Sequence, residues 1–285
     1  MSAPPPFKHI LVALDASPHS LAALATAAEL AAELGAELAG LFVEDTDLLH
    51  SASLPFVRQV SIFSSAATDA QQMECQFRVQ ADQMRRDLAL AAERLQVPWT
   101  FQVARGRVDS EVAAAADATD LLILGRTGWR AQQSGALGST ARRLLARAPR
   151  PTLMLQRRQL RLATPLAVLC DGTAASQEAL ATAAALTRVK GGPLEVLLVG
   201  TDLAPKTELA EWVRARLGPE TPDLRYRVSE LNFRGIAPLA HALNRTGAGA
   251  LVLPCGLLEM APDTLQTLIG QIEAPVLLVG PTDRN

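Results

Sequence analysis

The residues of this chain best suited to chemistry lie in one glycine-containing stretch, residues 121–140, which reads LLILGRTGWRAQQSGALGST. Four apolar residues lead into Gly125, the loop that follows contains Gly128, and an arginine-rich helical pattern begins near Gly138. Glycines let backbone N–H groups approach an anion closely, and a helix N-terminus adds donors and the positive end of its dipole. This order of strand, glycine loop and helix predicts a site for a phosphate chain.

The spacing of these glycines excludes the best-known nucleotide loops. A Walker loop needs Gly-Lys-Ser/Thr, and no lysine of the chain follows a glycine. No strand pattern is followed by G-x-G-x-x-G either. The chain instead has Gly125-x2-Gly128-x9-Gly138-Ser139. An ordinary connection between a strand and a helix is the alternative, although such connections are usually only a few residues long.

Length and composition indicate a globular protein with a substantial core. The chain has 285 residues, 49% hydrophobic and 20% charged, with a formal net charge of −2. Without a long basic block, this charge argues against general nucleic-acid binding. No apolar run reaches the length of a membrane span and residues 1–6 show no signal pattern, so we expect a cytoplasmic location by default. Cys75, Cys170 and Cys255 are isolated in the sequence, and we expect buried, reduced thiols.

An internal repeat divides the chain. The apolar run at residues 10–14 ends at Asp15, and the run at residues 166–170 ends at Asp171. In both places a hydroxyl residue then predicts the N-cap of a helix, and the sequence ALATAA occurs in both helices. These are two copies of one pattern.

Both copies alternate apolar strand runs with helical patterns, which is typical of a parallel sheet covered by helices on both faces. The expected strands are 8–14, 38–43, 98–104, 120–125 and 151–156, then 165–170, 194–200, 224–229, 249–254 and 275–280. We therefore expect an α/β fold of two tandem five-stranded parallel-sheet domains, residues 1–156 (the first half) and 165–285 (the second half), joined by a polar, basic linker at 157–164.

The second half is shorter and lacks the phosphate motif. Its fourth strand run ends at Pro254-Cys255-Gly256, and the next glycine, Gly270, is expected beside the last strand rather than at a helix start. A proline also removes a donor where a nucleotide loop would use one. We therefore expect nucleotide in the first half only, the alternative being a ligand that the second half binds by another route.

The glycine motif and the repeat together resemble the universal stress protein family, in a tandem form with two such domains in one chain. The resemblance extends from Lys8 to Val279, although only the first half carries the ATP-binding signature. It implies that each domain is a Rossmann-like, three-layer α/β/α unit of the adenine nucleotide alpha hydrolase type. It also implies that ATP is bound, with Mg²⁺ or Mn²⁺ shielding the phosphates.

The resemblance further implies where the nucleotide lies. Asp15 falls where the family meets the ribose hydroxyls, and its alternative is a turn residue beside Ser17. The backbone at Ala13 and Val43 falls against adenine. The complete set of expected nucleotide contacts is Ala13, Leu14, Asp15, Val43, Leu124, Gly125, Arg126, Thr127, Gly128, Gly138, Ser139 and Thr140.

Two features of the first half depart from a minimal site. Arg126-Thr127 stands where the family commonly has Ser-His, which would strengthen phosphate contact or change the preferred nucleotide. Residues 44–67 exceed a usual βα loop, and either a lid over the nucleotide or a surface loop is expected there.

Three classes of function are compatible with these patterns, and an ATP-binding, non-catalytic stress regulator is the one we expect. A related adenylating or pyrophosphate-releasing enzyme would need a catalytic lysine or a Ser-Gly-Gly loop after the first strand, and neither is present. Asp15, Ser17 and His19 are interpreted as a turn residue, an N-cap and an exposed first-turn residue rather than a triad. A nucleotide-independent scaffold and a slow ATP hydrolase are the alternatives.

The apolar runs 151–155 and 275–279 end the two halves and predict how they assemble. A terminal strand lies at a sheet edge, and an open apolar edge favours pairing. The resemblance implies that these last strands pair with each other, so we expect a pseudo-twofold pair within one chain, with two tethered, independent domains as the alternative. A homodimer of chains and an unidentified protein partner are compatible with either arrangement.

Overall fold

The structure, a computed structural model, describes residues 6–53, 70–125, 141–143, 150–155, 162–199, 206–219, 221, 223–231 and 234–280. The strands of the first half are β1 (His9–Leu14), β2 (Glu37–Asp45), β3 (Trp99–Gly106), β4 (Leu121–Gly125) and β5 (Thr152–Leu155). Those of the second half are β6 (Leu166–Cys170), β7 (Pro193–Leu198), β8 (Arg225–Glu230), β9 (Ala250–Pro254) and β10 (Val276–Val279). The predicted strands differ from these only at their ends.

These strands form one ten-stranded sheet with the order β3-β2-β1-β4-β5-β10-β9-β6-β7-β8. Both halves have the same internal order and purely parallel neighbours. At the centre β5 and β10 run antiparallel, with Leu153 opposite Leu277. The expected fold class is confirmed, and the two terminal runs pair as expected.

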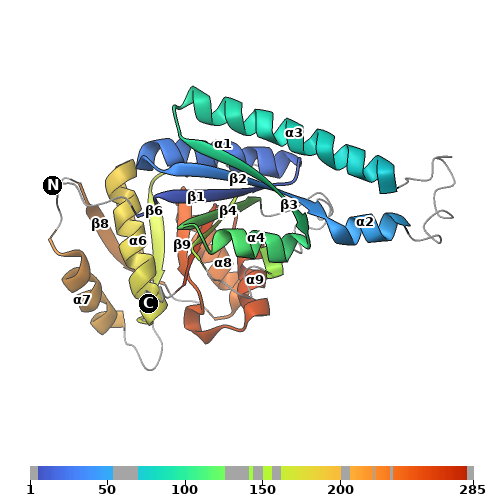
Figure 1. Cartoon of the computed structure of the whole chain (residues 1–285). Helices are drawn as coiled ribbons and strands as arrows, with labels where there is room; N and C mark the ends of the chain where they lie inside the picture. Colours follow the sequence, from blue (N-terminus) through green and yellow to red (C-terminus); the bar gives the residue numbers. More distant parts are fainter. Residues whose placement is uncertain are drawn as a thin grey trace.

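Helices cover both faces of this sheet (Figure 1). Those of the first half are α1 (Pro18–Leu34), α2 (Thr46–Ser53), α3 (Ala70–Arg94) and α4 (Val108–Ala116). Those of the second half are α6 (Ala174–Lys190), α7 (Lys206–Leu217), α8 (Ile236–Arg245), α9 (Pro262–Gln271) and a short 3-10 helix, η3 (Leu257–Glu259). Residues of α1, α3, α6 and α7 share one core cluster, whereas α4 and the pair α8 and α9 pack in separate clusters.

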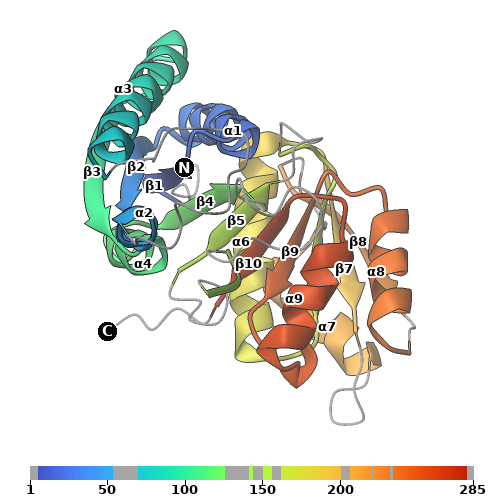
Figure 2. The same ribbon diagram turned by 90° about the vertical axis from the view of Figure 1, so that its right-hand side faces the viewer.

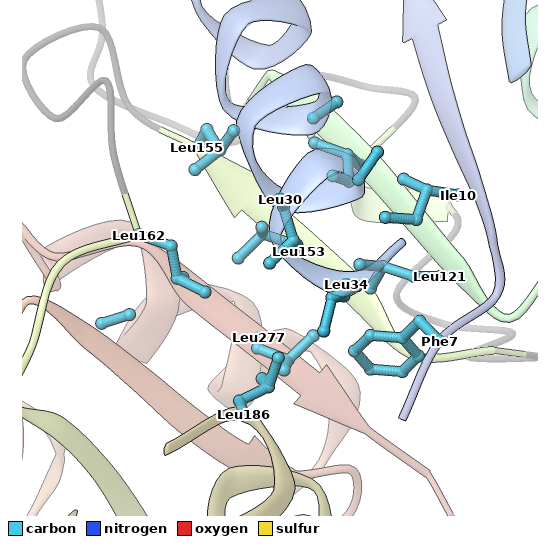
Figure 3. Close-up of a cluster of buried hydrophobic side chains, with 14 of the residues drawn as sticks. Phe7, Ile10, Leu30, Leu34, Leu121, Leu153, Leu155, Leu162, Leu186 and Leu277 are labelled. Carbon is cyan, nitrogen blue, oxygen red and sulfur yellow. The ribbon is translucent and has the colours of Figure 1, made fainter. Parts of the chain in front are cut away.

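The two halves share part of their core (Figure 3). Leu34 at the end of α1 and Leu186 on α6 lie close to Leu277 of β10 and are buried in the same cluster. Leu162, at the end of the expected linker, is only 4% exposed and belongs to this cluster too. Apolar side chains from both halves therefore exclude water together, as in the interior of one domain.

The helix starts predicted from sequence are confirmed. Ser17 caps α1, with its side chain accepting a hydrogen bond from the N–H of Ser20, and Thr173 caps α6 through the N–H of Ser176. Each cap satisfies an N–H that the first helical turn leaves without a partner. Gly35, with φ of 63°, ends α1 in the left-handed conformation, which glycine adopts without steric cost.

One expectation about the cysteines is wrong. Cys75 is exposed on α3, whereas Cys170 is buried and Cys255 half-buried, so the expected burial of all three thiols fails at Cys75. Gly270 lies in the last turn of α9, shortly before β10, so it does not begin a helix, as expected. No helix in the described ranges is both long and apolar enough to cross a membrane.

Candidate functional site

The expected nucleotide site lies at the carboxyl end of β1 and β4. These strands are parallel neighbours, with Val12 opposite Ile123, yet the chain leaves β1 toward β2 on the other side. Such a reversal opens a crevice at the carboxyl ends of the strands, where α/β proteins bind ligands. The fold thus brings Asp15, which follows β1, and Gly125, which ends β4, to the same edge.

Asp15 takes part in the turn that starts α1. Its Oδ1 accepts a hydrogen bond from the N–H of Ser17 at 3.0 Å, and its own N–H donates to Oγ of Ser20 at 3.1 Å. Ala16 between them has φ of 58°, an uncommon conformation for a residue with a Cβ atom. The carboxylate is exposed, and within the described part of the chain its Oδ2 accepts no hydrogen bond. Asp15 therefore does stabilise the turn, through Oδ1, and Oδ2 is the carboxylate oxygen that a ligand could contact.

Side-chain burial limits how the neighbouring residues could meet a nucleotide. Leu14 and Leu124 are 4% and 5% exposed and point into core clusters, so only their backbone atoms could contact a ligand. Ala13 and Val43 are half-buried and pack against the cluster that contains Leu124 and residues of α4. The predicted adenine contacts thus lie on one face of the sheet, on neighbouring strands.

Packing favours glycine at position 125 whether or not a ligand binds. A Cβ atom there would lie 3.0 Å from the Cβ atom of His19 and 3.2 Å from its carbonyl carbon, closer than ordinary contacts. The first turn of α1 therefore crosses directly over the end of β4. His19 is half-buried, so the expectation of an exposed first-turn residue is wrong.

The remaining motif residues, Arg126, Thr127, Gly128, Gly138, Ser139 and Thr140, lie outside the described residues. So does most of the segment 44–67, of which the end of β2 and the helix α2 are described.

Asp109 is a candidate site residue that the sequence interpretation missed. Its Oδ1 lies 3.2 Å from Nη1 of Arg143 and 3.6 Å from Nε of Arg107. The carboxylate is 12% exposed, so solvent screens these two contacts less than it screens surface pairs. Arg143 follows the glycine motif closely in sequence, so Asp109 ties that part of the chain to α4. Asp109 lies in the first turn of α4, which follows the carboxyl end of β3, and this position at the ligand-binding side of a parallel sheet could have revealed it.

The corresponding place in the second half is closed by the chain itself. Asp171, the counterpart of Asp15, is 4% exposed. Its Oδ1 accepts hydrogen bonds from both the N–H and the hydroxyl of Thr173, at 3.1 Å and 2.7 Å. Its Oδ2 accepts a 2.8 Å bond from the N–H of Leu258, in the η3 turn that follows β9. Both oxygens are thus engaged.

The thiols of Cys170 and Cys255, the two less exposed cysteines, are expected to be poorly reactive. Burial raises the pKa of Cys170 to about 12, with the neighbouring Asp171 charge adding to the effect. Burial likewise raises the pKa of Cys255 to about 11. A thiol is nucleophilic and binds metals as the thiolate, so neither residue suits catalysis or metal binding. Among the residues that the structure describes, no group of three or more His, Cys, Asp or Glu side chains could hold a metal ion.

The strand order, with its reversal between β1 and β4, defines a Rossmann-like α/β protein. A family model described as the universal stress protein family matches residues 6–156, more than half of the chain, so the chain belongs to the universal stress protein family. No curated protein matches the chain.

Solved structures with the same fold span both halves. A universal stress protein from Archaeoglobus fulgidus is 15% identical with a TM-score of 0.71, and the similarity covers 97% of each chain. A putative universal stress protein from Pseudomonas aeruginosa is 14% identical with a TM-score of 0.58, covering 97% of this chain and 94% of the other. At these identities the likeness concerns the fold.

Proposed function

We propose that this protein is an ATP-binding regulator of a stress response that holds nucleotide in its first half only. The observation that carries the proposal is the contrast between Asp15 and Asp171, which occupy corresponding turns. Asp15 is exposed and offers Oδ2, whereas Asp171 is buried and its Oδ2 already accepts the N–H of Leu258. In this proposal the first aspartate accepts hydrogen bonds from the ribose hydroxyls, and the second does not.

The glycine motif supports a phosphate site beside Asp15. It lies within the residues that match the family, and it starts at Gly125, at the same edge of the sheet as Asp15. In this proposal Gly138, Ser139 and Thr140 supply donors to the phosphates, and Arg126 adds a positive charge. Mg²⁺ or Mn²⁺ would enter with the nucleotide, because these ions commonly keep waters and phosphate oxygens as ligands.

The tandem arrangement is part of the proposal. Residues 1–156 and 165–285 are two universal stress protein domains, with 157–164 as the linker. Support comes from the identical strand order of the halves and from the Archaeoglobus structure, whose similarity extends over the whole chain. The second domain then serves as a binding surface for a protein partner, and a cytoplasmic location belongs to the same proposal.

We propose no catalytic residue. The N–H of Ser17 donates to Asp15 in a turn, and the Ser17 hydroxyl caps α1, with no base bonded to it among the described residues. Slow ATP hydrolysis and a nucleotide-independent scaffold are the competing functions.

Mass spectrometry of small molecules released by denaturing the purified full chain tests the proposal, followed by calorimetry with ATP, ADP and AMP in the presence of Mg²⁺. One adenine nucleotide site per chain is expected. Gly138→Val should abolish binding because its side chain blocks backbone approach to the phosphates, while the melting temperature of the nucleotide-free protein stays close to that of the wild type. No binding by the folded wild type would favour the scaffold, two sites per chain would contradict the closed second half, and steady phosphate release would favour the hydrolase.

A further inference from the structure

The strand β3 has a free edge. It pairs with β2 on one side and ends the sheet, and among the described residues no strand lies beyond it. Figure 2 shows β3 at the outer margin of the molecule, with α3 on one side of it and α4 on the other. A strand edge of this kind presents unpaired N–H and C=O groups that can bind another strand.

The two edges of the sheet differ in charge. The other edge strand, β8, carries exposed Arg225, Arg227 and Glu230, and such charges discourage pairing with another chain. In β3 the run 99–104, Trp-Thr-Phe-Gln-Val-Ala, has no charge and is rich in residues that favour strands. In β3 the one charged residue is Arg105, near the end of the strand, whereas the charges of β8 lie along its whole length, so β3 is the less protected edge.

An apolar groove runs along this edge. Its floor consists of alternate residues of β3, namely Trp99, Phe101 and Val103, and Asp82 and Arg85 of α3 line its side. The groove has a volume of about 240 Å³, and Val103 is 46% exposed within it. Groove and free edge share the residues Trp99, Phe101 and Val103, so a strand added to β3 would place alternate side chains beside this aromatic floor.

We propose that the occupant is a second copy of this chain, whose β3 pairs antiparallel with the first about a twofold axis at Phe101. The N–H of Leu38 in β2 donates to the carbonyl oxygen of Pro98. Because strand residues alternate, the groups of Thr100 and Gln102 also face β2, while those of Phe101 face outward. The outward groups are the ones that antiparallel pairing at Phe101 would use.

This register is self-complementary. On the groove face Phe101 meets Phe101 of the second copy and Trp99 meets Val103, while on the other face Thr100 meets Gln102. Aromatic and β-branched pairs across strands are favourable, and no like charges are brought together. If the two strands were shifted by two residues relative to each other, Trp99 would instead lie opposite Arg105. The guanidinium of Arg105 already donates a hydrogen bond to Oε1 of Glu74, with Nη2 at 2.7 Å.

The helices fit this arrangement as well. Since α3 packs over β2 and β3, and strands lie about 4.8 Å apart, two copies of α3 would lie about 10 Å apart across the axis. That is within the spacing of packed helices, about 8–10 Å. The second copy thus extends the sheet without displacing α3.

Sedimentation of the full chain over a wide concentration range tests the proposal. The wild type should shift from the mass of one chain to that of two. Val103→Lys places a charge on the edge and should weaken dimerisation by at least about tenfold. Val189→Lys, at a position 39% exposed on α6 of the second half, adds the same charge away from β3 and α3 and should dimerise as the wild type does. A single-chain mass at every concentration, or dimers that Val103→Lys leaves unchanged, would overturn the proposal.

Hydrogen exchange provides the second measurement. The amides of Trp99, Phe101 and Val103 should exchange more slowly as concentration rises, whereas those of Thr100 and Gln102, which face β2, should be protected throughout. Protection of the outward amides in dilute, single-chain samples would show that another segment of the same chain covers β3, and the proposal would fail.

Discussion

A Cβ atom added to Gly125 would lie 3.0 Å from the Cβ atom of His19. In Gly125→Ala the first turn of α1 or the end of β4 must therefore shift by a few tenths of an ångström. We expect the free energy of unfolding to fall by about 1–3 kcal/mol in the absence of nucleotide. Gly270→Ala is the matched control, because no atom lies within 4 Å of its added Cβ, and it should stabilise by up to about 1 kcal/mol. Urea unfolding of both variants measures the difference. If the free energy of unfolding of Gly125→Ala equals that of the wild type, packing does not require this glycine, and only ligand binding would explain it.

The two corresponding aspartates should respond in opposite ways to alanine. Asp15→Ala should weaken ATP binding by about 1–3 kcal/mol, because two hydrogen bonds to the ribose are lost. Asp171→Ala should leave ATP binding unchanged but lower the free energy of unfolding by about 1–3 kcal/mol, because the N–H groups of Thr173 and Leu258 lose their buried acceptor.

Calorimetry and urea unfolding of both variants separate the two effects. If Asp15→Ala binds ATP as tightly as the wild type does, Asp15 only stabilises the turn and does not bind the ribose. Weakened ATP binding in Asp171→Ala would show that the second half takes part in the nucleotide site.

Asp109 should act on nucleotide binding through Arg143. Asp109→Asn keeps the size of the side chain but removes the charge that holds Arg143. We expect ATP affinity to fall by about 0.5–1 kcal/mol, a modest loss because the Arg143 side chain is 53% exposed. Asp117→Asn, at the exposed end of the same helix α4, is the control and should bind ATP normally. Equal ATP affinities for the two variants would show that Asp109 has no role in nucleotide binding.

Asp120, at the amino ends of β1 and β4, should make the stability of the protein depend on pH in the acid range. Partial burial would raise its pKa, but hydrogen bonds from the N–H groups of Lys8 and His9, together with the charge of His9, hold the pKa below its usual value. A lowered pKa means that its contribution is present above the unfolded-state pKa and is lost as pH falls through the folded-state value.

Asp120→Asn should therefore be less stable than the wild type near neutral pH, and the difference should shrink as the pH falls below about 4. Urea unfolding between pH 3 and 7 measures this. A difference that stays constant across this range would rule out the proposed linkage.

Much of the fold could be predicted from the sequence, because the signals are local. The apolar run before Asp15 and the cap at Ser17 predict a strand and a helix from the hydrogen-bonding needs of a few consecutive residues, and the structure has both. The return of the same pattern around Asp171 predicts a second strand and a second capped helix, and the structure has β6 and α6 there.

Tertiary contacts decided what the local pattern could not express. Asp15 and Asp171 follow the same kind of strand, yet only Asp171 is closed, because Leu258, distant in sequence, folds back to donate its N–H. His19 is half-buried because the end of β4 passes beneath it. Burial and hydrogen-bond partners depend on residues far apart in the chain. The sequence alone therefore determined the elements and the motif, while packing decided that the carboxylate of Asp171 is buried and that of Asp15 is exposed.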